Sequence, residues 1–154
     1  MLRAWVPDDV PFLWDMLLTA IHVPDGHEPP PKSILDDPAI AHYLAGFGTL
    51  EGDDAVVACD QDGRRLGAAW VRRLPPDDGG FGFVGADIPE LSMAVLPEHR
   101  GRGLGRAMLE VLLASHPVMS LSVATDNAVA VRLYKSLGFA EVRPDGTSTT
   151  MVRR

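Results

Sequence analysis

A short run of arginines and glycines is the part of the sequence most suited to chemistry. Glycines and cations alternate there over seven positions: Arg100, Gly101, Arg102, Gly103, Leu104, Gly105 and Arg106. A backbone without Cβ atoms can adopt unusual dihedral angles and approach a ligand closely. Its N–H groups can then form an anion-binding nest at the start of a helix. The run therefore predicts a polyphosphate site, because a turn that only closes a loop would not need three cations.

Two common phosphate-binding motifs are absent from this run. A nucleotide P-loop requires G-x-x-x-x-G-K-[ST], and the sequence contains no Gly-Lys pair. The dinucleotide fingerprint G-x-G-x-x-G fails, because its sixth position is Arg106 when counted from Gly101 and Met108 when counted from Gly103. The polyphosphate is therefore expected to be bound through another motif.

The overall charge contrasts with this basic run. The chain of 154 residues has 14 Lys and Arg against 21 Asp and Glu, which gives a net charge of −7. That balance disfavours a nucleic-acid or anionic-membrane partner, since both require surplus cation. With 46% hydrophobic and 23% charged residues, the composition is that of a folded globular protein. The length predicts one domain, residues 1–154.

The sequence shows no signal for a membrane, for secretion or for a metal. No apolar stretch approaches the roughly 18 residues that span a bilayer, and the N-terminal residues reach Pro7 too early for a signal peptide. We therefore expect a cytoplasmic protein. The single cysteine, Cys59, excludes an internal disulfide framework and a cysteine-rich zinc site, and no metal is expected. Its apolar neighbours predict a buried, inert thiol rather than a catalytic nucleophile.

Hydrophobic spacing predicts the elements that position these residues. The first half of the chain is expected to contain, in order, a strand at 2–6, a helix from Pro7 to about Ala20, a proline-rich loop at 22–38, a short helix within 34–50, and strands at 55–59 and 64–74 around a hairpin turn. After a glycine-rich loop at 75–89, the second half is expected to contain a strand at 90–96, a helix at 103–115, a strand at 118–124, a helix at 127–137, and a hairpin of strands at 139–142 and 147–152. This order predicts one mixed α/β domain.

Three segments together resemble the GNAT superfamily of N-acetyltransferases. The spacing Arg-x-x-Gly-x-Gly, from Arg100 to Gly105, resembles the family's pyrophosphate-binding signature. Residues 91–97 resemble its fourth strand, and the pattern N-x-x-A-x-x-L-Y-x-x-x-G-F at 127–139 resembles its late helix and following strand. The matches cover residues 90–143, and the order of elements extends the resemblance to the whole chain. An unrelated phosphate-binding domain would leave the pattern at 127–139 unexplained.

The resemblance implies a fold and a co-substrate. The fold is a single mixed, mostly antiparallel sheet of about six to seven strands, flanked by about four helices and splayed by a bulge between the fourth and fifth strands. Acetyl-CoA is expected in that gap, where the backbone of Met93, Ala94 and Val95 would bond its pantetheine arm and acetyl carbonyl and a free N–H could stabilise an oxyanion. The amides of residues 100–106 are expected to hold the pyrophosphate. Asn127 is expected to cap its helix and, as in the family, to bond the pantetheine, while the small Ala130 lets the cofactor approach.

The resemblance also assigns catalytic roles. It makes Tyr134 the general acid that protonates the departing thiolate, a role that suits a phenol of pKa about 10. The alternative is a core tyrosine with a satisfied hydroxyl. Glu90 is expected to accept or relay the proton of the amine, or else to be an exposed carboxylate at a strand end, and the weaker candidates are Asp87, His22 and His27. Transfer is expected to be direct, in a ternary complex in which proximity supplies most of the acceleration.

The acceptor is expected to enter between the loops at 22–38 and 75–89. Both loops carry acids that would attract a cationic amine or would merely be solvated, namely Asp25, Glu28, Asp36, Asp37, Asp77, Asp78 and Asp87. Three functions stay open: transfer to a small-molecule amine, transfer to a protein or peptide amine through an open groove, and acyl-CoA binding without catalysis. Tyr134 and Asn127 argue against the last. A monomer or homodimer is expected.

Overall fold

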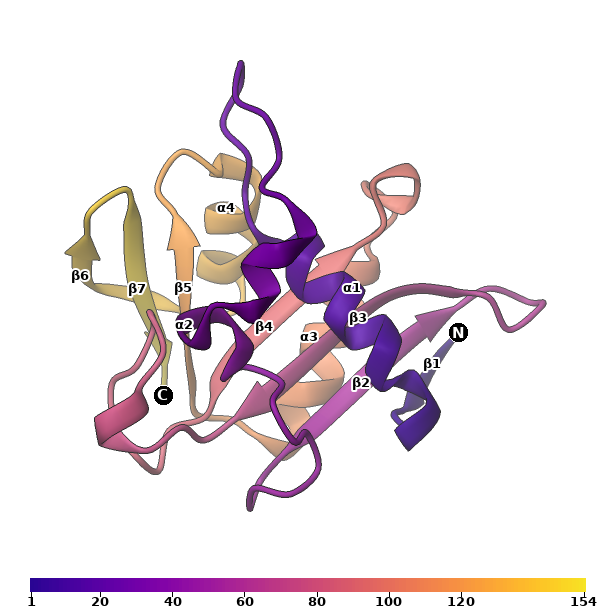
Figure 1. The fold of residues 1–154 in the computed structure, drawn as a ribbon, viewed down its shortest axis with the longest axis horizontal. Coiled ribbons are helices and arrows are strands. Elements are labelled where there is room, and N and C mark those ends of the chain that lie inside the picture. Colours follow the sequence, from indigo (N-terminus) through magenta and orange to yellow (C-terminus); the bar gives the residue numbers. More distant parts are fainter.

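Seven strands and four α-helices make up the computed structural model, which describes residues 1–154 (Figure 1). In chain order the elements are β1 (Leu2–Ala4), α1 (Val10–Ala20), α2 (Pro38–Ala41), β2 (Asp54–Cys59), β3 (Arg65–Arg72), β4 (Glu90–Val95), α3 (Leu104–Ser115), β5 (Met119–Ala124), α4 (Ala128–Ser136), β6 (Ala140–Asp145) and β7 (Ser148–Arg153). Short 3-10 helices lie in the connections at Pro7–Asp9, Lys32–Asp36, Pro76–Asp78 and Pro97–His99. The order of strands and α-helices is the predicted one.

The strands form one mixed sheet in the order β1-β2-β3-β4-β5-β7-β6. All neighbours are antiparallel except β4 and β5, which are parallel and share a single register pair, Glu90 with Ser120. Beyond that pair the two strands diverge toward their C-terminal ends and open a gap in the middle of the sheet (Figure 1). The mostly antiparallel sheet, splayed after its fourth strand, confirms the predicted fold class.

The gap forms without the expected bulge in β4. Residues of β4 pair with β3 in unbroken register, from Glu90 opposite Arg72 to Val95 opposite Gly67. The register shifts of the sheet lie instead at the end of β2 and within β6. The expectation of a bulge in β4 is therefore wrong. Since β4 and β5 share only one register pair, the sheet divides there into two half-sheets, β1-β2-β3-β4 and β5-β7-β6.

Apolar side chains pack on both faces of this sheet. Helices α1 and α2 cover one face, and α3 and α4 cover the other (Figure 1). The α1 face is packed around Trp70 of β3, and the α3 face around Met108. Along β4, Ala94 belongs to the first cluster and Leu91 to the second, as the alternation of a strand requires. By the same alternation, Glu90 faces α1 and α2.

Two element boundaries differ from the sequence expectations. α2 is limited to Pro38–Ala41, and the chain after it turns at Gly46 and Gly48, whose φ angles are +62° and +98°. β6 continues through Pro144 to Asp145, where the sequence predicts a turn. Proline is tolerated there because β6 is an edge strand, so its missing N–H removes no bond of the sheet.

A buried carboxylate ties the N-terminal strand to the start of α1. Both carboxylate oxygens of Asp9 accept hydrogen bonds from the guanidinium of Arg3, at 2.8 Å each. Nε of Arg65 and the N–H of Val6 also donate to this carboxylate, at 2.7 Å and 2.8 Å. The hydrogen bonds from Arg3 hold the pKa of Asp9 well below its usual range. This anchor lies apart from the gap and serves stability.

Two further sequence expectations concern Cys59 and the helices. Cys59 is a free thiol and is buried at the end of β2, as predicted. It therefore behaves as a small apolar residue of the core. None of the helices combines the length and the apolar character that a membrane crossing needs.

Candidate active site

The gap between β4 and β5 exposes main-chain groups of β4. At its closed end, the N–H of Ser120 donates to the carbonyl oxygen of Pro89 at 2.9 Å. Residues two positions apart in a strand direct their main-chain groups to the same side, so Met93 and Val95 also direct theirs toward β5. No residue of β5 pairs with either. The N–H groups of Met93 and Val95 are therefore directed into the gap.

Ala94 has the opposite orientation. The N–H of Leu96 donates to the carbonyl oxygen of Leu66 at 2.9 Å, which places alternate residues of this segment in hydrogen-bonded pairs with β3. The main-chain groups of Ala94 therefore bond β3. The carbonyl oxygen of Val95 accepts a hydrogen bond from Nε of Arg100 at 3.1 Å. Of the three β4 residues expected to bond acetyl-CoA, the structure brings the main chain of Met93 and Val95 to the gap.

The glycine-rich turn leads directly from β4 into α3. Gly101 and Gly103 have φ angles of +78° and +79°, a region that residues with side chains rarely adopt. A Cβ atom at Gly105 would lie 3.4 Å from Cε of Met93, an ordinary contact distance, so packing does not require glycine there. The left-handed turn therefore rests on Gly101 and Gly103.

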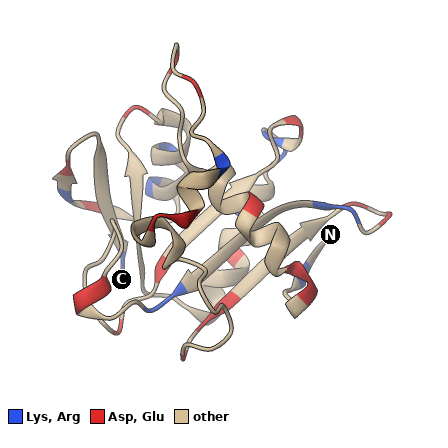
Figure 2. Cartoon of the chain, viewed as in Figure 1, with Lys and Arg blue, Asp and Glu red and all other residues tan.

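Residues 101–106 present free hydrogen-bond donors at the start of α3. Their N–H groups donate to no other backbone group of the protein. The side chains of Arg100, Arg102 and Arg106 are exposed, and their partners are neutral groups rather than carboxylates. These cations belong to the turn after β4 and the start of α3 (Figure 2). Free N–H groups and positive charge at a helix start suit a polyphosphate.

Tyr134 lies on the inner side of α4. Its side chain is buried and packs against Phe139, with ring centroids 5.7 Å apart. Burial raises the pKa of Tyr134 to about 12, and no hydrogen bond to the hydroxyl offsets this. A phenol with this pKa is protonated at neutral pH and can donate its proton. Its role as general acid stays a prediction.

Asn127 begins α4, as predicted. Its side-chain oxygen accepts a hydrogen bond from the N–H of Ala130 at 3.3 Å, which confirms the helix cap. Ala130 is half-buried and packs beside the core cluster of the α3 face. The expected bond between Asn127 and a cofactor stays a prediction.

Glu90 is a buried side chain rather than an exposed one at a strand end, with 2% of its surface exposed. Its Oε1 accepts a hydrogen bond from the N–H of Gly80 at 2.9 Å. Its Oε2 accepts from the N–H of Gly82 and from the hydroxyl of Tyr43, at 3.2 Å each. Burial raises the pKa of Glu90, although these hydrogen bonds act in the opposite direction. A raised carboxyl pKa suits a proton acceptor, but the expectation of that role stays a prediction.

Two hydrogen bonds tie the segment after α2 to the loop between β3 and β4. Nδ1 of His42 lies 3.0 Å from Oδ1 of Asp78. The hydroxyl oxygen of Tyr43 accepts a hydrogen bond from the N–H of Phe81 at 2.7 Å. The space between these two loops is therefore bridged at this end.

The weaker proton-acceptor candidates have other surroundings. His22 and His27 are exposed, and Nε2 of His22 lies 3.1 Å from Oδ1 of Asp126. Asp87 is exposed and lines a hollow beside His116. The other predicted loop acids are exposed as well, and the loops that carry them are marked by acidic segments in Figure 2: Asp25, Glu28, Asp36, Asp37, Asp77 and Asp78.

Sequence reasoning did not identify Tyr43 as a partner of Glu90. The two residues are 47 positions apart, and Tyr43 belongs to the segment that follows α2. Helical spacing indicates only that Tyr43 faces inward. Their contact depends on how two loops fold onto the sheet, which no local pattern encodes.

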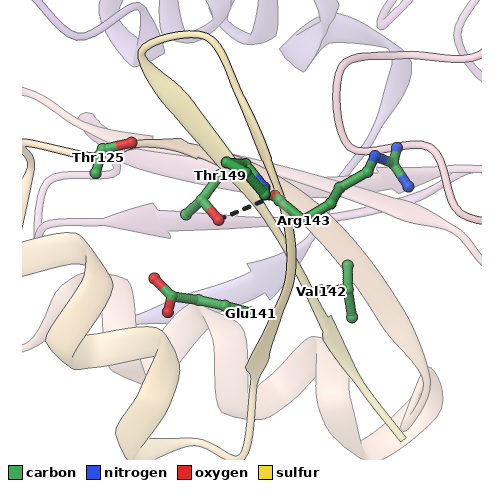
Figure 3. A pocket seen from close by; sticks show the side chains of 6 residues that line it. Thr125, Glu141, Val142, Arg143 and Thr149 are labelled. Atoms are coloured by element: carbon green, nitrogen blue, oxygen red, sulfur yellow. Dashed lines mark hydrogen bonds between the residues drawn. The ribbon is translucent and has the colours of Figure 1, made fainter.

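A hollow of about 360 Å³ lies between the end of β5 and the hairpin of β6 and β7 (Figure 3). It is lined by Thr125, Glu141, Val142, Arg143, Pro144 and Thr149. The hydroxyl of Thr149 donates to the carbonyl oxygen of Arg143 at 3.1 Å. None of the predicted site residues lines this hollow, so it is separate from the gap.

Comparison with known proteins agrees with this geometry. Residues 51–141 match the family model described as an acetyltransferase (GNAT) domain. The chain is 37% identical over 111 residues to mycothiol acetyltransferase of Tsukamurella paurometabola, which covers 68% of this chain and 33% of that protein. It is 36% identical over 91 residues to the N-alpha-acetyltransferase RimI of Mycobacterium tuberculosis, over 56% of this chain and 52% of that protein. The chain thus spans a third to a half of the length of these relatives.

Solved structures share the fold over the whole chain. A ribosomal-protein-alanine N-acetyltransferase from Brucella melitensis superposes with a TM-score of 0.69 at 20% identity, covering 99% of this chain and 98% of that one. yncA of Salmonella typhimurium, a putative acetyltransferase solved with acetyl-CoA, gives a TM-score of 0.69 at 22% identity, over 100% and 92% of the two chains. At such identities the likeness concerns the fold.

Proposed function

Because this chain belongs to the GNAT family of acetyltransferases, we propose that it transfers an acetyl group from acetyl-CoA to a primary amine. The observation that carries the proposal is that two groups of unpaired main-chain N–H donors follow each other along the chain. The main-chain N–H groups of Met93 and Val95 border the gap, and those of residues 101–106 follow them at the start of α3. A cofactor whose extended arm leads into a pyrophosphate fits this arrangement, with its arm along β4 and its phosphates at the turn.

The proposed chemistry is direct transfer in a ternary complex. The N–H groups of Met93 and Val95 are aimed where the thioester carbonyl would lie, and a donor in that position stabilises the oxyanion of the tetrahedral intermediate. The amine nitrogen forms the new bond to the acetyl carbon as the carbon–sulfur bond breaks. Tyr134 donates its proton to the departing sulfur, and Asn127 and Ala130 border the arm. Proximity in the complex supplies most of the acceleration.

The proton of the attacking amine needs an acceptor. Glu90 is the sequence-based candidate, and burial favours it by raising its pKa. To take a proton, its carboxylate would have to use an acceptor site that Gly80, Gly82 and Tyr43 leave free. A water chain is the alternative acceptor. A change of Glu90 to Gln distinguishes them, since a water chain would leave kcat almost unchanged.

A small molecule is the proposed acceptor. The hydrogen bonds of His42 with Asp78 and of Tyr43 with Phe81 close the loop at 75–89 onto the segment after α2, on the proposed acceptor side. A protein or peptide substrate would need an open groove there, so this closure favours a compact amine. The exposed acids of the loops at 22–38 and 75–89 favour a cationic one. Transfer to a peptide amine is the second candidate, because RimI is among the relatives.

Thiol release from acetyl-CoA, measured against a panel of amines, tests the proposal. The panel contains polyamines, aminoglycosides, amino acids and peptides with free N-terminal or lysine amines. Transfer to a compact cationic amine is the expected result, and transfer to peptides alone would favour the second candidate. Binding of acetyl-CoA without thiol release on any amine would indicate a non-catalytic acyl-CoA-binding protein.

We further propose that the protein is cytoplasmic and is a monomer or a homodimer.

A further inference from the structure

The loop between β3 and β4 crosses the sheet on the α1–α2 face at residues 80–83, a segment here called the strap. The strap lies directly on the backbone of β5. A Cβ atom at Gly82 would come within 2.5 Å of the carbonyl carbon of Leu121 and 2.7 Å of the nitrogen of Ser122. A residue with a side chain could not take this place without moving the strap off the strand. Glycine is therefore required here for a close approach of two backbones.

The first three residues of the strap are held by two side chains through their N–H groups. Glu90 of β4 accepts from Gly80 at 2.9 Å and from Gly82 at 3.2 Å. Tyr43 accepts from Phe81 at 2.7 Å and donates its own hydroxyl proton to Glu90 at 3.2 Å. The carboxylate and the phenol thus act as one unit, with every N–H of the three residues satisfied.

The strap is also held on its carbonyl side, from the other half-sheet. The hydroxyl of Thr150 on β7 donates to the carbonyl oxygen of Phe81 at 3.3 Å. Nη2 of Arg143 on β6 donates to the carbonyl oxygen of Phe83 at 2.6 Å. Side chains from β4, β6, β7 and the segment after α2 therefore fix four consecutive residues. These hydrogen bonds hold the strap in one conformation, although its sequence is rich in glycine.

The strap borders the proposed transfer site. Glu90 shares the α1–α2 face of β4 with Ser92 and Ala94, and it stands at the closed end of the gap, opposite Ser120. The strap therefore lines the closed end of the gap on the α1–α2 face, which is the face from which the proposed acceptor approaches. The acids of the same loop, Asp77 and Asp78, are exposed on this side.

We propose that Glu90 is a positioning residue, whose carboxylate fixes the strap beside the gap so that the strap selects which amines reach the acetyl group. The inference rests on the proposed function, since it assigns the strap to the acceptor side of that reaction. It differs from the sequence-based expectation, in which the carboxylate of Glu90 takes the proton of the amine. Three donors already occupy most of the roughly four acceptor sites of a carboxylate.

Hydrogen exchange of the strap amides tests the anchoring without any amine substrate. In the wild type, the N–H groups of residues 80–82 should exchange slowly. Glu90→Gln places an NH₂ group against donors, and Tyr43→Phe removes the acceptor of the N–H of Phe81. Both changes should speed exchange at residues 80–82 by about tenfold or more, while amides of β2 stay protected. Glu51→Gln is the matched control, because Glu51 has a side chain that is 95% exposed and pairs only with Arg73.

Steady-state kinetics with an amine that the wild type acetylates test the role. Glu90→Gln, Tyr43→Phe and Thr150→Val should each raise the KM of the amine by about tenfold, with the KM of acetyl-CoA unchanged and kcat altered less. The conservative Glu90→Asp should behave like Glu90→Gln, since it keeps a carboxylate but draws it away from the strap. Tyr43→Phe and Thr150→Val keep the test open if changes at Glu90 prevent folding.

The opposite pattern would overturn the proposal. If Glu90 takes the proton, Glu90→Gln should lower kcat by about 100-fold or more with unchanged amide protection, and Tyr43→Phe should leave kcat and KM as they were. Fast exchange of the strap amides in the wild type would also overturn it. Absence of transfer to every amine would instead count against the proposed function, and the exchange data would still decide whether Glu90 anchors the strap.

Discussion

The two sides of the gap between β4 and β5 are built from different parts of the chain. On the proposed cofactor side, the polar groups are main-chain N–H groups, of Met93 and Val95 in the strand and of residues 101–106 in the turn. On the proposed acceptor side they are the side chains of Glu90, Tyr43 and Thr150, which hold a loop. The first set comes from one continuous segment, whereas the second joins residues from distant parts of the sequence.

This difference affects how each side tolerates change. A site made of main-chain groups depends on backbone conformation, so it responds to glycine replacement and is less sensitive to the loss of single side chains. A site made of side chains responds to the loss of one hydroxyl or carboxylate. Substitutions can therefore separate the two sides, because each should change the KM of only one substrate.

The largest effect is expected for Gly103→Val. A β-branched residue at a φ of +79° carries strain of about 1–3 kcal/mol, so the turn should distort and the KM of acetyl-CoA should rise by about 10- to 100-fold. Gly63→Val is the matched control, since Gly63 has a φ of +81° in the turn between β2 and β3. The control should lose stability and keep both KM values. An unchanged KM for acetyl-CoA in Gly103→Val would remove the turn from the cofactor site.

The second-largest effect is expected for Tyr134→Phe, and it should appear in kcat. Loss of the proton donor should lower kcat by roughly tenfold or more, with both KM values little changed. Folding should be nearly unaffected, because the hydroxyl has no hydrogen-bond partner whose loss would destabilise the core. Thermal unfolding checks this point. A kcat equal to that of the wild type would make Tyr134 a packing residue of α4.

A smaller effect is expected for the arginines of the turn. Arg102→Ala should raise the KM of acetyl-CoA about two- to fivefold, and the difference from the wild type should shrink at high salt, since exposed charges are screened. Arg132→Ala, an exposed arginine of α4, provides the control. Both variants are measured at two salt concentrations. An equal increase in the KM of acetyl-CoA at both salt concentrations would indicate that Arg102 does not act through its charge.

No effect on either KM is expected for Asp9→Asn, which changes stability alone. The pKa of Asp9 is lowered in the folded state, so its contribution is present above the ordinary value of 3.8 and is lost as the pH falls below it. The wild type should lose thermal stability between pH 5 and pH 3 more steeply than Asp9→Asn, by a contribution of about 1–3 kcal/mol. Melting temperatures across this pH range check the prediction. Identical pH profiles would contradict the role of Asp9 as an anchor.

The same contrast explains what could be predicted from the sequence. Glycine spacing and cation content identify the turn at 100–106, because a left-handed backbone and a helix start leave local signals. The cap at Asn127 follows from the residue type at a helix start, and the inner position of Tyr134 follows from helical spacing. The strap could not be predicted, since Glu90 and Tyr43 lie 47 positions apart and meet only after the loops fold.

Two errors have specific physical reasons. A bulge was expected to explain the splay, but β4 pairs with β3 in unbroken register and keeps only one register pair with β5, so the splay needs no extra residue in β4. Ala94 was expected to face the gap with its neighbours, although the alternation of hydrogen bonds along a strand turns its main chain toward β3. The direction of the Ala94 main chain could have been predicted from the sequence, because alternation follows once the bounds of the strand are known.

The separation of β4 from β5 gives the sheet two extra edges, and these lie inside the molecule. Outer edges of sheets invite pairing with other chains, and proteins commonly protect them with charge, proline or irregular register. The outer strand β6 has all three, in Glu141, Arg143 and Pro144 and in its register shift. The inner edge at Met93 and Val95 has neither charge nor proline. This edge faces the other half-sheet across the gap, so its unpaired N–H groups lie within the sheet order and not at its border.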